Sequence, residues 1–149
     1  MKRIIITLCF GIFFITKIFA STGGYVEYIC PLCNTKFESF TQFSYSTFGQ
    51  NLDLRPWGAA IIPTPIPKCP ECKLVFYEDF LTEAEIHILR EELNKNNIFL
   101  NEPNMPNYYY LARVAEIVRH DLEDIIWCFL SAVWENRNEE MNNILILLL

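Results

Sequence analysis

The sequence predicts an α+β protein in which a small β-rich head with a long proline-rich loop, residues 21–80, is followed by a tail of three helices, residues 81–149. Three observations predict this division. Aromatic residues, turn formers and prolines dominate the chain as far as Phe80. Helical periodicity of the apolar residues begins at Leu81. The length of 149 residues suits one domain or two small lobes that share a core.

The overall composition excludes two broad classes of protein. Apolar residues make up 52% of the chain and charged residues 20%, and this balance excludes a chain that is disordered throughout. Lysine and arginine together number 12 against 18 acidic residues, which gives a net charge of −6, and they form no basic run. Nucleic acid is therefore not an expected partner, because binding its phosphates requires a basic surface.

The first segment, residues 1–20, has the pattern of a secretory signal peptide. Met1-Lys2-Arg3 is a basic start, residues 4–15 are almost uninterrupted apolar sequence, and Ala20 is a small residue suited to cleavage. The alternative is an uncleaved membrane anchor, but Lys17 interrupts the apolar run before the ~20 residues that a spanning helix needs. We therefore expect export to the periplasm or cell envelope, with no stable membrane span after cleavage.

In the head, two short segments are β-prone, and each lies beside a pair of cysteines. Residues 25–29 alternate in the manner of a strand, and residues 74–77 form a second β-prone run. Residues 44–68 are expected to be a long ordered loop, because closely spaced prolines force an extended segment without ladder hydrogen bonds. The prolines of this loop are Pro56, Pro63, Pro65 and Pro67. Trp57 is expected to anchor the loop onto the head.

The tail is expected to contain three helices with recognisable ends. Thr82 and Glu85 form a capping-box pattern at the start of the first helix, which stops at residues 96–97. The second is expected to begin near residues 104–106 and to end in the polar turn at residues 119–121. The third has an apolar face broader than one partner helix would cover. Residues 144–149 are too short an apolar run to span a bilayer and are expected to pack inward, unless the chain is cut short.

The strongest chemical signal is the pair of matched motifs Cys30-Pro31-Leu32-Cys33 and Cys69-Pro70-Glu71-Cys72. Each motif makes a tight turn that presents two sulfurs on one side, so the pair is suited to hold zinc in a tetrahedron of four thiolates. Phe37 and Phe76 follow the motifs at the same interval and are expected to pack over the two turns. Four cysteine ligands leave no position for water, so the predicted site is structural. Its ligands are Cys30, Cys33, Cys69 and Cys72.

Two other interpretations of these cysteines remain open. Export would deliver the chain to a compartment where disulfides persist, so the four residues would form two disulfides, with Cys128 as a buried free thiol. Alternatively, one Cys-Pro-x-Cys motif would act in thiol-disulfide exchange, which requires its first cysteine at a helix N-terminus. Neither motif opens an evident helix.

The sequence offers little other chemistry. His87 and His120 lie outside any metal-ligand motif and are expected to be solvated. The chain also lacks the zinc-protease, serine-hydrolase and phosphate-loop signatures. We therefore expect no enzymatic activity.

Several segments together resemble a bacterial family of unknown function, the domain of unknown function 2225. The matching segments are the first Cys-Pro-x-Cys motif, the Phe-Gly-Gln-Asn-Leu-Asp-Leu-Arg-Pro-Trp-Gly stretch at residues 48–58, the proline-rich approach to the second motif, the aromatic and acidic residues 76–80, and the tail from Thr82. The resemblance covers residues 28–134. It implies a zinc-ribbon-like head followed by helices similar to tetratricopeptide repeats, and it implies no established activity.

The chain also departs from these patterns. The packing positions of a tetratricopeptide repeat are matched by Leu111, Ala112 and Ala115. However, His120 stands where Gly is usual, and Ile125 where Ala is usual. Asn34 and Lys73 replace the Gly that commonly follows such cysteine turns, and Lys adopts the left-handed conformation at a cost, so distortion of the second turn is expected.

These features predict an exported, non-enzymatic protein with a structural zinc site. Stacked repeats of this kind need about three copies to bury their faces, and the tail holds scarcely one. The tail is therefore expected to bind a protein partner or a second copy of the chain. The first alternative is a disulfide-stapled envelope protein of the same architecture, and the second is a thiol-disulfide oxidoreductase.

Overall fold

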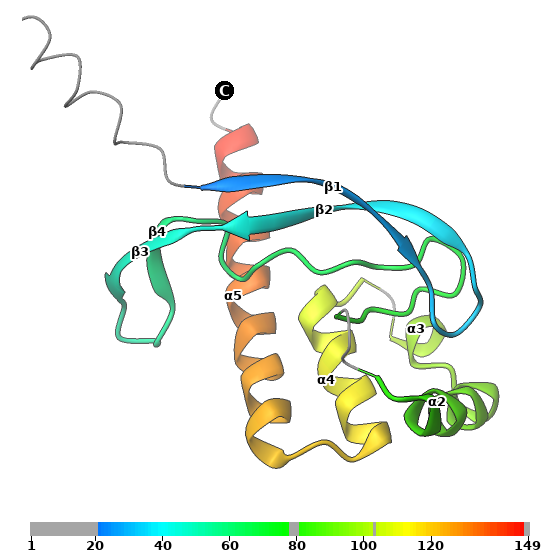
Figure 1. Ribbon diagram of the computed structural model, residues 1–149. Coiled ribbons are helices and arrows are strands. Elements are labelled where there is room, and N and C mark those ends of the chain that lie inside the picture. Colours follow the sequence, from blue (N-terminus) through cyan, green and yellow to red (C-terminus); the bar gives the residue numbers. More distant parts are fainter. Residues whose placement is uncertain (1–20, 78–80, 103, 148–149) are drawn as a thin grey trace, which may run out of the picture.

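The computed structural model describes residues 21–77, 81–102 and 104–147. Within these residues the strands are β1 (Thr22–Ile29), β2 (Lys36–Ser44), β3 (Ser46–Gln50) and β4 (Pro56–Ala59), and the helices are α2 (Glu83–Lys95), α3 (Ile98–Asn101), α4 (Asn107–Val118) and α5 (Leu122–Leu147) (Figure 1). The chain is therefore a mixed α+β protein, which confirms that part of the prediction. The predicted signal peptide, residues 1–20, and the predicted end of the head at residues 78–80 lie outside the described residues.

The first sheet is the antiparallel pair β1 and β2, which lies across one end of the helices (Figure 1). The strand predicted at residues 25–29 is confirmed and begins earlier, at Thr22. Its partner β2 was not predicted, because Phe37, Phe40 and Phe43 recur every third residue instead of alternating. Aromatic pairs hold the strands together, and the Tyr25 and Phe40 rings meet edge to face at 5.9 Å between centroids.

The second sheet corrects the prediction of a continuous loop over residues 44–68. Strands β3 and β4 form a hairpin within that segment. Pro56 is tolerated as the first residue of β4, because a strand with one partner can spare an N–H group. The turn is closed by Leu54, whose φ is 63°, and by the Asn51 N–H, which donates to the Arg55 carbonyl at 2.9 Å. Trp57 packs on Phe48 of the same hairpin at 5.7 Å between ring centroids, so its expected role as an anchor onto the head was wrong.

The second predicted strand, at residues 74–77, is also corrected. Only Val75 pairs there, in an isolated bridge to Lys68. The segment opposite it contains Pro67, which has no N–H to donate and accepts from the Phe76 N–H at 3.4 Å. Residues 74–76 are buried in the core, so their apolar character reflects burial and not a regular strand.

The helices of the tail begin and end close to the predicted residues. The capping box at Thr82 is present, because the Glu85 N–H donates to the Thr82 hydroxyl and the Glu85 carboxylate accepts from the Thr82 N–H. Asn97 caps the one-turn helix α3, which was not predicted, through the Phe99 N–H at 3.1 Å. Arg119, with a φ of 64°, ends α4. Residues 144–149, predicted to pack inward, lie outside the side chains that the structure describes.

Helix α4 lies at the centre of the tail, between α5 on one side and α2 and α3 on the other (Figure 1). Helices α4 and α5 run antiparallel side by side. The core joins head and tail, because one cluster of buried residues contains members of both. These include Cys30, Cys69, Leu74 and Val75 of the head and Leu89, Leu111 and Val114 of the tail. Among the described residues, no helix is both long enough and apolar enough to cross a membrane.

Candidate metal centre

Two turns with the same backbone geometry form the candidate metal centre. We call them the first knuckle, residues 30–35, and the second knuckle, residues 69–74. In the first, the Cys30 N–H donates to the Thr35 carbonyl at 2.9 Å and the Asn34 N–H donates to the Cys30 carbonyl at 2.9 Å. In the second, the corresponding bonds run from Cys69 to Leu74 at 2.8 Å and from Lys73 to Cys69 at 3.1 Å. The equivalence predicted from the repeated motif is therefore present in the backbone.

The second knuckle is not distorted, although Lys73 stands where Gly was expected. Asn34 and Lys73 have φ values of 60° and 63°, so both occupy the left-handed region. An L-residue with a Cβ adopts this conformation at a cost of about 1–2 kcal/mol, and Asn reduces that cost. The second knuckle therefore has the same backbone geometry as the first, although Lys73 by itself disfavours the left-handed conformation.

The two knuckles bring all four predicted ligands together. The sulfurs of Cys30, Cys33, Cys69 and Cys72 all lie within 4.8 Å of one another. Across the knuckles, Cys30 Sγ lies 3.5 Å from Cys72 Sγ, and Cys33 Sγ lies 3.5 Å from Cys69 Sγ. Four thiolates bound to one zinc ion at about 2.3 Å would stand about 3.8 Å apart, so this cluster has the size of a tetrahedral metal site.

The structure joins no two of these sulfurs in a disulfide. A disulfide joins its sulfurs at about 2.05 Å, well below the 3.5 Å observed across the knuckles. None of the five cysteines in the described part of the chain is bonded to another. Cys128 lies on α5 outside the cluster and is buried and free, as predicted.

Burial differs across the cluster. Cys30 and Cys69, the first cysteine of each knuckle, are fully buried, whereas Cys72 is half-buried and Cys33 is exposed. Burial raises the pKa of the Cys30 thiol to about 11 and also raises the pKa of Cys72. The centre is therefore closed toward the core and open to solvent at Cys33.

The pKa of Cys33 is shifted in the opposite direction, below the ordinary value of a thiol. Desolvation would raise its pKa, but hydrogen bonds with the Thr35 side chain and backbone, and with Cys30 and Cys69, together lower the pKa to about 6. The Cys33 sulfur and the Thr35 hydroxyl are 3.2 Å apart. Thr35 was not singled out from the sequence, because the second knuckle has Leu74 at the corresponding position.

Aromatic residues join the two knuckles on one side. The Phe37 and Phe76 rings, which follow the knuckles, meet edge to face at 6.3 Å between centroids. Tyr28 of β1 contacts both, at 6.0 Å from Phe37 and 6.2 Å from Phe76. The two phenylalanines therefore contact each other as well as packing against the core, and they link the knuckles without a covalent bond.

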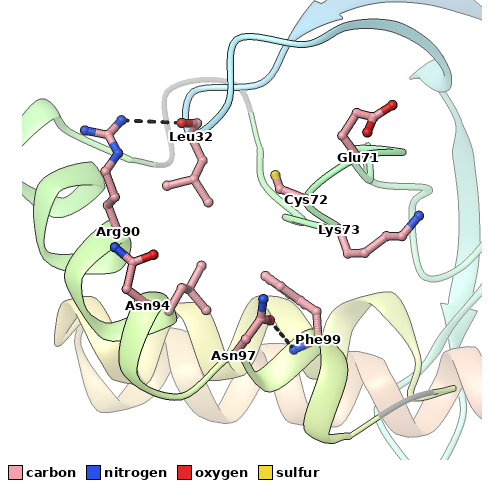
Figure 2. A pocket seen from close by; sticks show the side chains of 9 residues that line it. Leu32, Glu71, Cys72, Lys73, Arg90, Asn94, Asn97 and Phe99 are labelled. Atoms are coloured by element: carbon pink, nitrogen blue, oxygen red, sulfur yellow. Dashed lines mark hydrogen bonds between the residues drawn. The ribbon is translucent and has the colours of Figure 1, made fainter.

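On another side, the knuckles face helix α2 across a cavity of about 360 Å³ (Figure 2). Leu32 and Cys72 line it from the knuckles, and Leu93 and Phe99 line it from α2 and α3. Arg90 bridges the two sides, because its guanidinium donates to the Leu32 carbonyl at 3.4 Å (Figure 2). The centre is therefore built against the helical tail, so its loss is expected to disturb the tail as well.

The histidines lie outside the cluster. His87 is exposed on α2, with Nδ1 3.5 Å from a Glu91 carboxylate oxygen. His120 differs from the prediction of a solvated residue, because its side chain is only 17% exposed and its Nε2 lies 3.2 Å from a Glu85 oxygen. It connects the turn between α4 and α5 to the start of α2. Neither histidine completes a metal or catalytic site with the cysteines.

No family model, no curated protein and no solved structure matches the chain. The fold and the cluster define a mixed α+β protein with four converging cysteines that are able to bind a metal ion.

Proposed function

We propose that the protein is an exported, non-enzymatic binding protein whose head is stabilised by one structural zinc ion. The observation that carries this proposal is the convergence of four sulfurs, within 4.8 Å of one another, from two turns of equivalent geometry. Four thiolates form the ligand set that zinc accepts in structural sites, and they leave no open coordination position for a substrate or water.

Two observations favour zinc over the other interpretations. Cross-knuckle separations of 3.5 Å suit ligands of one ion and exceed a disulfide bond. Each knuckle is a turn, and neither cysteine pair opens a helix whose N-terminus would activate a thiol for exchange. The disulfide-stapled protein is the second candidate, supported by the predicted export to an oxidising compartment.

We also propose that the head is zinc-ribbon-like and the tail tetratricopeptide-like, in line with the resemblance to the domain of unknown function 2225. Antiparallel packing of α4 and α5 supports the comparison, as does the complete burial of the repeat-like positions Leu111, Ala112 and Ala115. His120 stands where a repeat usually has Gly, but this costs little conformational energy, because the residue of the turn with a left-handed backbone is Arg119 and not His120.

The tail is proposed to bind a protein partner or a second copy of the chain. Leu122, Ile126 and Val133 are spaced along one face of α5 and are 70%, 56% and 64% exposed. Apolar side chains exposed at helical spacing are suited to bury against another protein.

The test combines elemental analysis of the exported protein, purified without added metal, with its intact mass under denaturing, non-reducing conditions. The proposal predicts one zinc ion for each chain, free thiols at all four positions and a mass that lacks residues 1–20. A mass lower by four hydrogens, without zinc, would support the two disulfides instead. Cys30→Ser should abolish zinc binding, whereas the matched variant Cys128→Ala should retain it.

A further inference from the structure

A second cavity lies away from the metal centre, between the proline-rich segment and helices α4 and α5. Its volume is about 160 Å³, well below the roughly 300–1,000 Å³ of sites for drug-sized ligands. Five aromatic side chains line it: Tyr45, Tyr77, Tyr108, Trp127 and Trp134. They come from the link between β2 and β3, from the end of the head and from helices α4 and α5, so only the folded chain assembles them. The size suits a single small chemical group.

The aromatic rings form a box with a closed floor and an open rim. Trp134 and Tyr108 are 2% and 5% exposed, whereas Tyr45 and Trp127 are 53% and 50% exposed. The Trp127 and Trp134 rings are perpendicular, at 88° and 5.3 Å between centroids. The Tyr77 and Tyr108 rings are inclined at 64° and 6.3 Å apart. Within each pair the two rings are therefore not parallel, so the pair presents ring surface in two different directions.

The polar groups of the buried rings are already engaged. The Tyr108 hydroxyl donates to the Thr64 carbonyl at 2.8 Å and is hydrogen-bonded to the Tyr77 hydroxyl. The Trp134 indole N–H donates to the Asp53 carbonyl at 3.2 Å. Polar and apolar atoms share the lining, to which Ser131 and Thr64 also contribute, but the polar groups of Tyr77, Tyr108 and Trp134 are already bonded within the protein.

Fixed charges around the cavity come in both signs. A Glu135 carboxylate oxygen accepts from the Tyr108 N–H at 2.9 Å, and the Arg55 guanidinium donates to the carbonyl of Ile62, which lines the cavity, at 3.0 Å. Because the nearby charges are of both signs, we expect the aromatic ring faces to decide whether a cation or a neutral group binds. Aromatic faces carry negative electrostatic potential and attract cations, most effectively those that are weakly hydrated.

We propose that this aromatic box binds a trimethylammonium group, as found in choline and in choline headgroups. Such a group is compact and bears a positive charge spread over methyl surfaces that pack on aromatic rings. It has no hydrogen-bond donor, which suits a box in which the polar groups of Tyr77, Tyr108 and Trp134 are engaged within the protein. The proposal does not depend on the metal centre, which lies in another part of the fold.

The test is an NMR titration of the full exported chain, followed through the methyl resonance of the ligand. The probe is choline, and its control is 3,3-dimethylbutan-1-ol, a neutral molecule of the same shape. We expect saturable binding of choline and about tenfold weaker binding of the neutral analogue. Equal affinities for both, or no binding of choline, would overturn the proposal.

Variants locate the site. Trp127→Leu and Tyr45→Leu alter half-exposed rim residues and should each weaken choline binding at least about fivefold, with circular dichroism unchanged. Trp57→Leu is the matched control, because Trp57 is also 50% exposed but lies on β4 and does not line the box. An equal loss in the Trp57→Leu variant would contradict the assignment.

Phosphatidylcholine vesicles distinguish two sources of the same group. Cosedimentation with these vesicles, but not with phosphatidylglycerol vesicles, would support a lipid headgroup as the source, and loss of that binding in Trp127→Leu would place it in the box. Binding of free choline alone would support a soluble ligand.

Discussion

The two knuckles share a backbone but lie in different surroundings. The first buries Cys30 but reaches the surface at Cys33, which is exposed and is hydrogen-bonded to Thr35. The second continues into the core, where Leu74 and Val75 are fully buried. The turn geometry therefore comes from the local motif, and we expect the stability of each half of the site to depend on what surrounds it.

The largest effect is expected from removing a buried ligand. Cys69→Ser should prevent zinc binding and leave a partly satisfied hydroxyl in the core, with a loss of more than about 4 kcal/mol in the free energy of unfolding. Cys33→Ser also removes a ligand but leaves its hydroxyl in solvent, so its loss should be smaller. Urea unfolding with parallel zinc analysis measures both. Equal losses would show that the burial of a ligand does not affect its contribution to stability.

The next effect concerns the aromatic contacts between the knuckles. Phe76 is 5% exposed, and Phe76→Ala should cost about 3–5 kcal/mol because it opens a cavity in the core. Phe37 is only half-buried, so Phe37→Ala should cost less. Thermal unfolding of the zinc-bound variants gives the comparison, and a larger loss for Phe37→Ala would reverse the proposed order.

The smallest effect concerns the left-handed residues. Lys73→Gly should stabilise the protein by about 1 kcal/mol, because Gly adopts the observed φ without the steric cost of a Cβ. Asn34→Gly should change stability by less than about 0.5 kcal/mol, because Asn already tolerates that region. Both replaced side chains are exposed, so few packing contacts are lost. A destabilised Lys73→Gly variant would indicate that the Lys73 side chain itself is needed.

Short sequence motifs predicted those parts of the molecule whose conformation depends on residues close together in the chain. Thr82 and Glu85 indicated the start of α2, because a capping box depends on residues within one turn. The repeated Cys-Pro-x-Cys spacing predicted two equivalent knuckles for the same reason. The convergence of their sulfurs required the assumption that one metal ion holds both, and the structure brings them together.

Features that depend on distant partners were missed. Strand β2 was not predicted because its phenylalanines do not alternate along the strand. They pack against β1 and against Phe76 after the second knuckle, on both faces of the β1–β2 sheet. The β3–β4 hairpin was obscured by Pro56, whose missing N–H matters little at a sheet edge. The aromatic box draws on separate segments, so no pattern in the sequence could have indicated it.

X-ray absorption at the zinc edge of the purified protein would show directly whether the four cysteines hold one zinc ion. We predict one zinc ion with a single shell of four sulfur ligands at about 2.3 Å. In Cys33→Ser, the shell should lose one sulfur if any zinc is retained. A shell that includes nitrogen or oxygen in the native protein, or the absence of zinc together with two disulfides, would contradict this prediction.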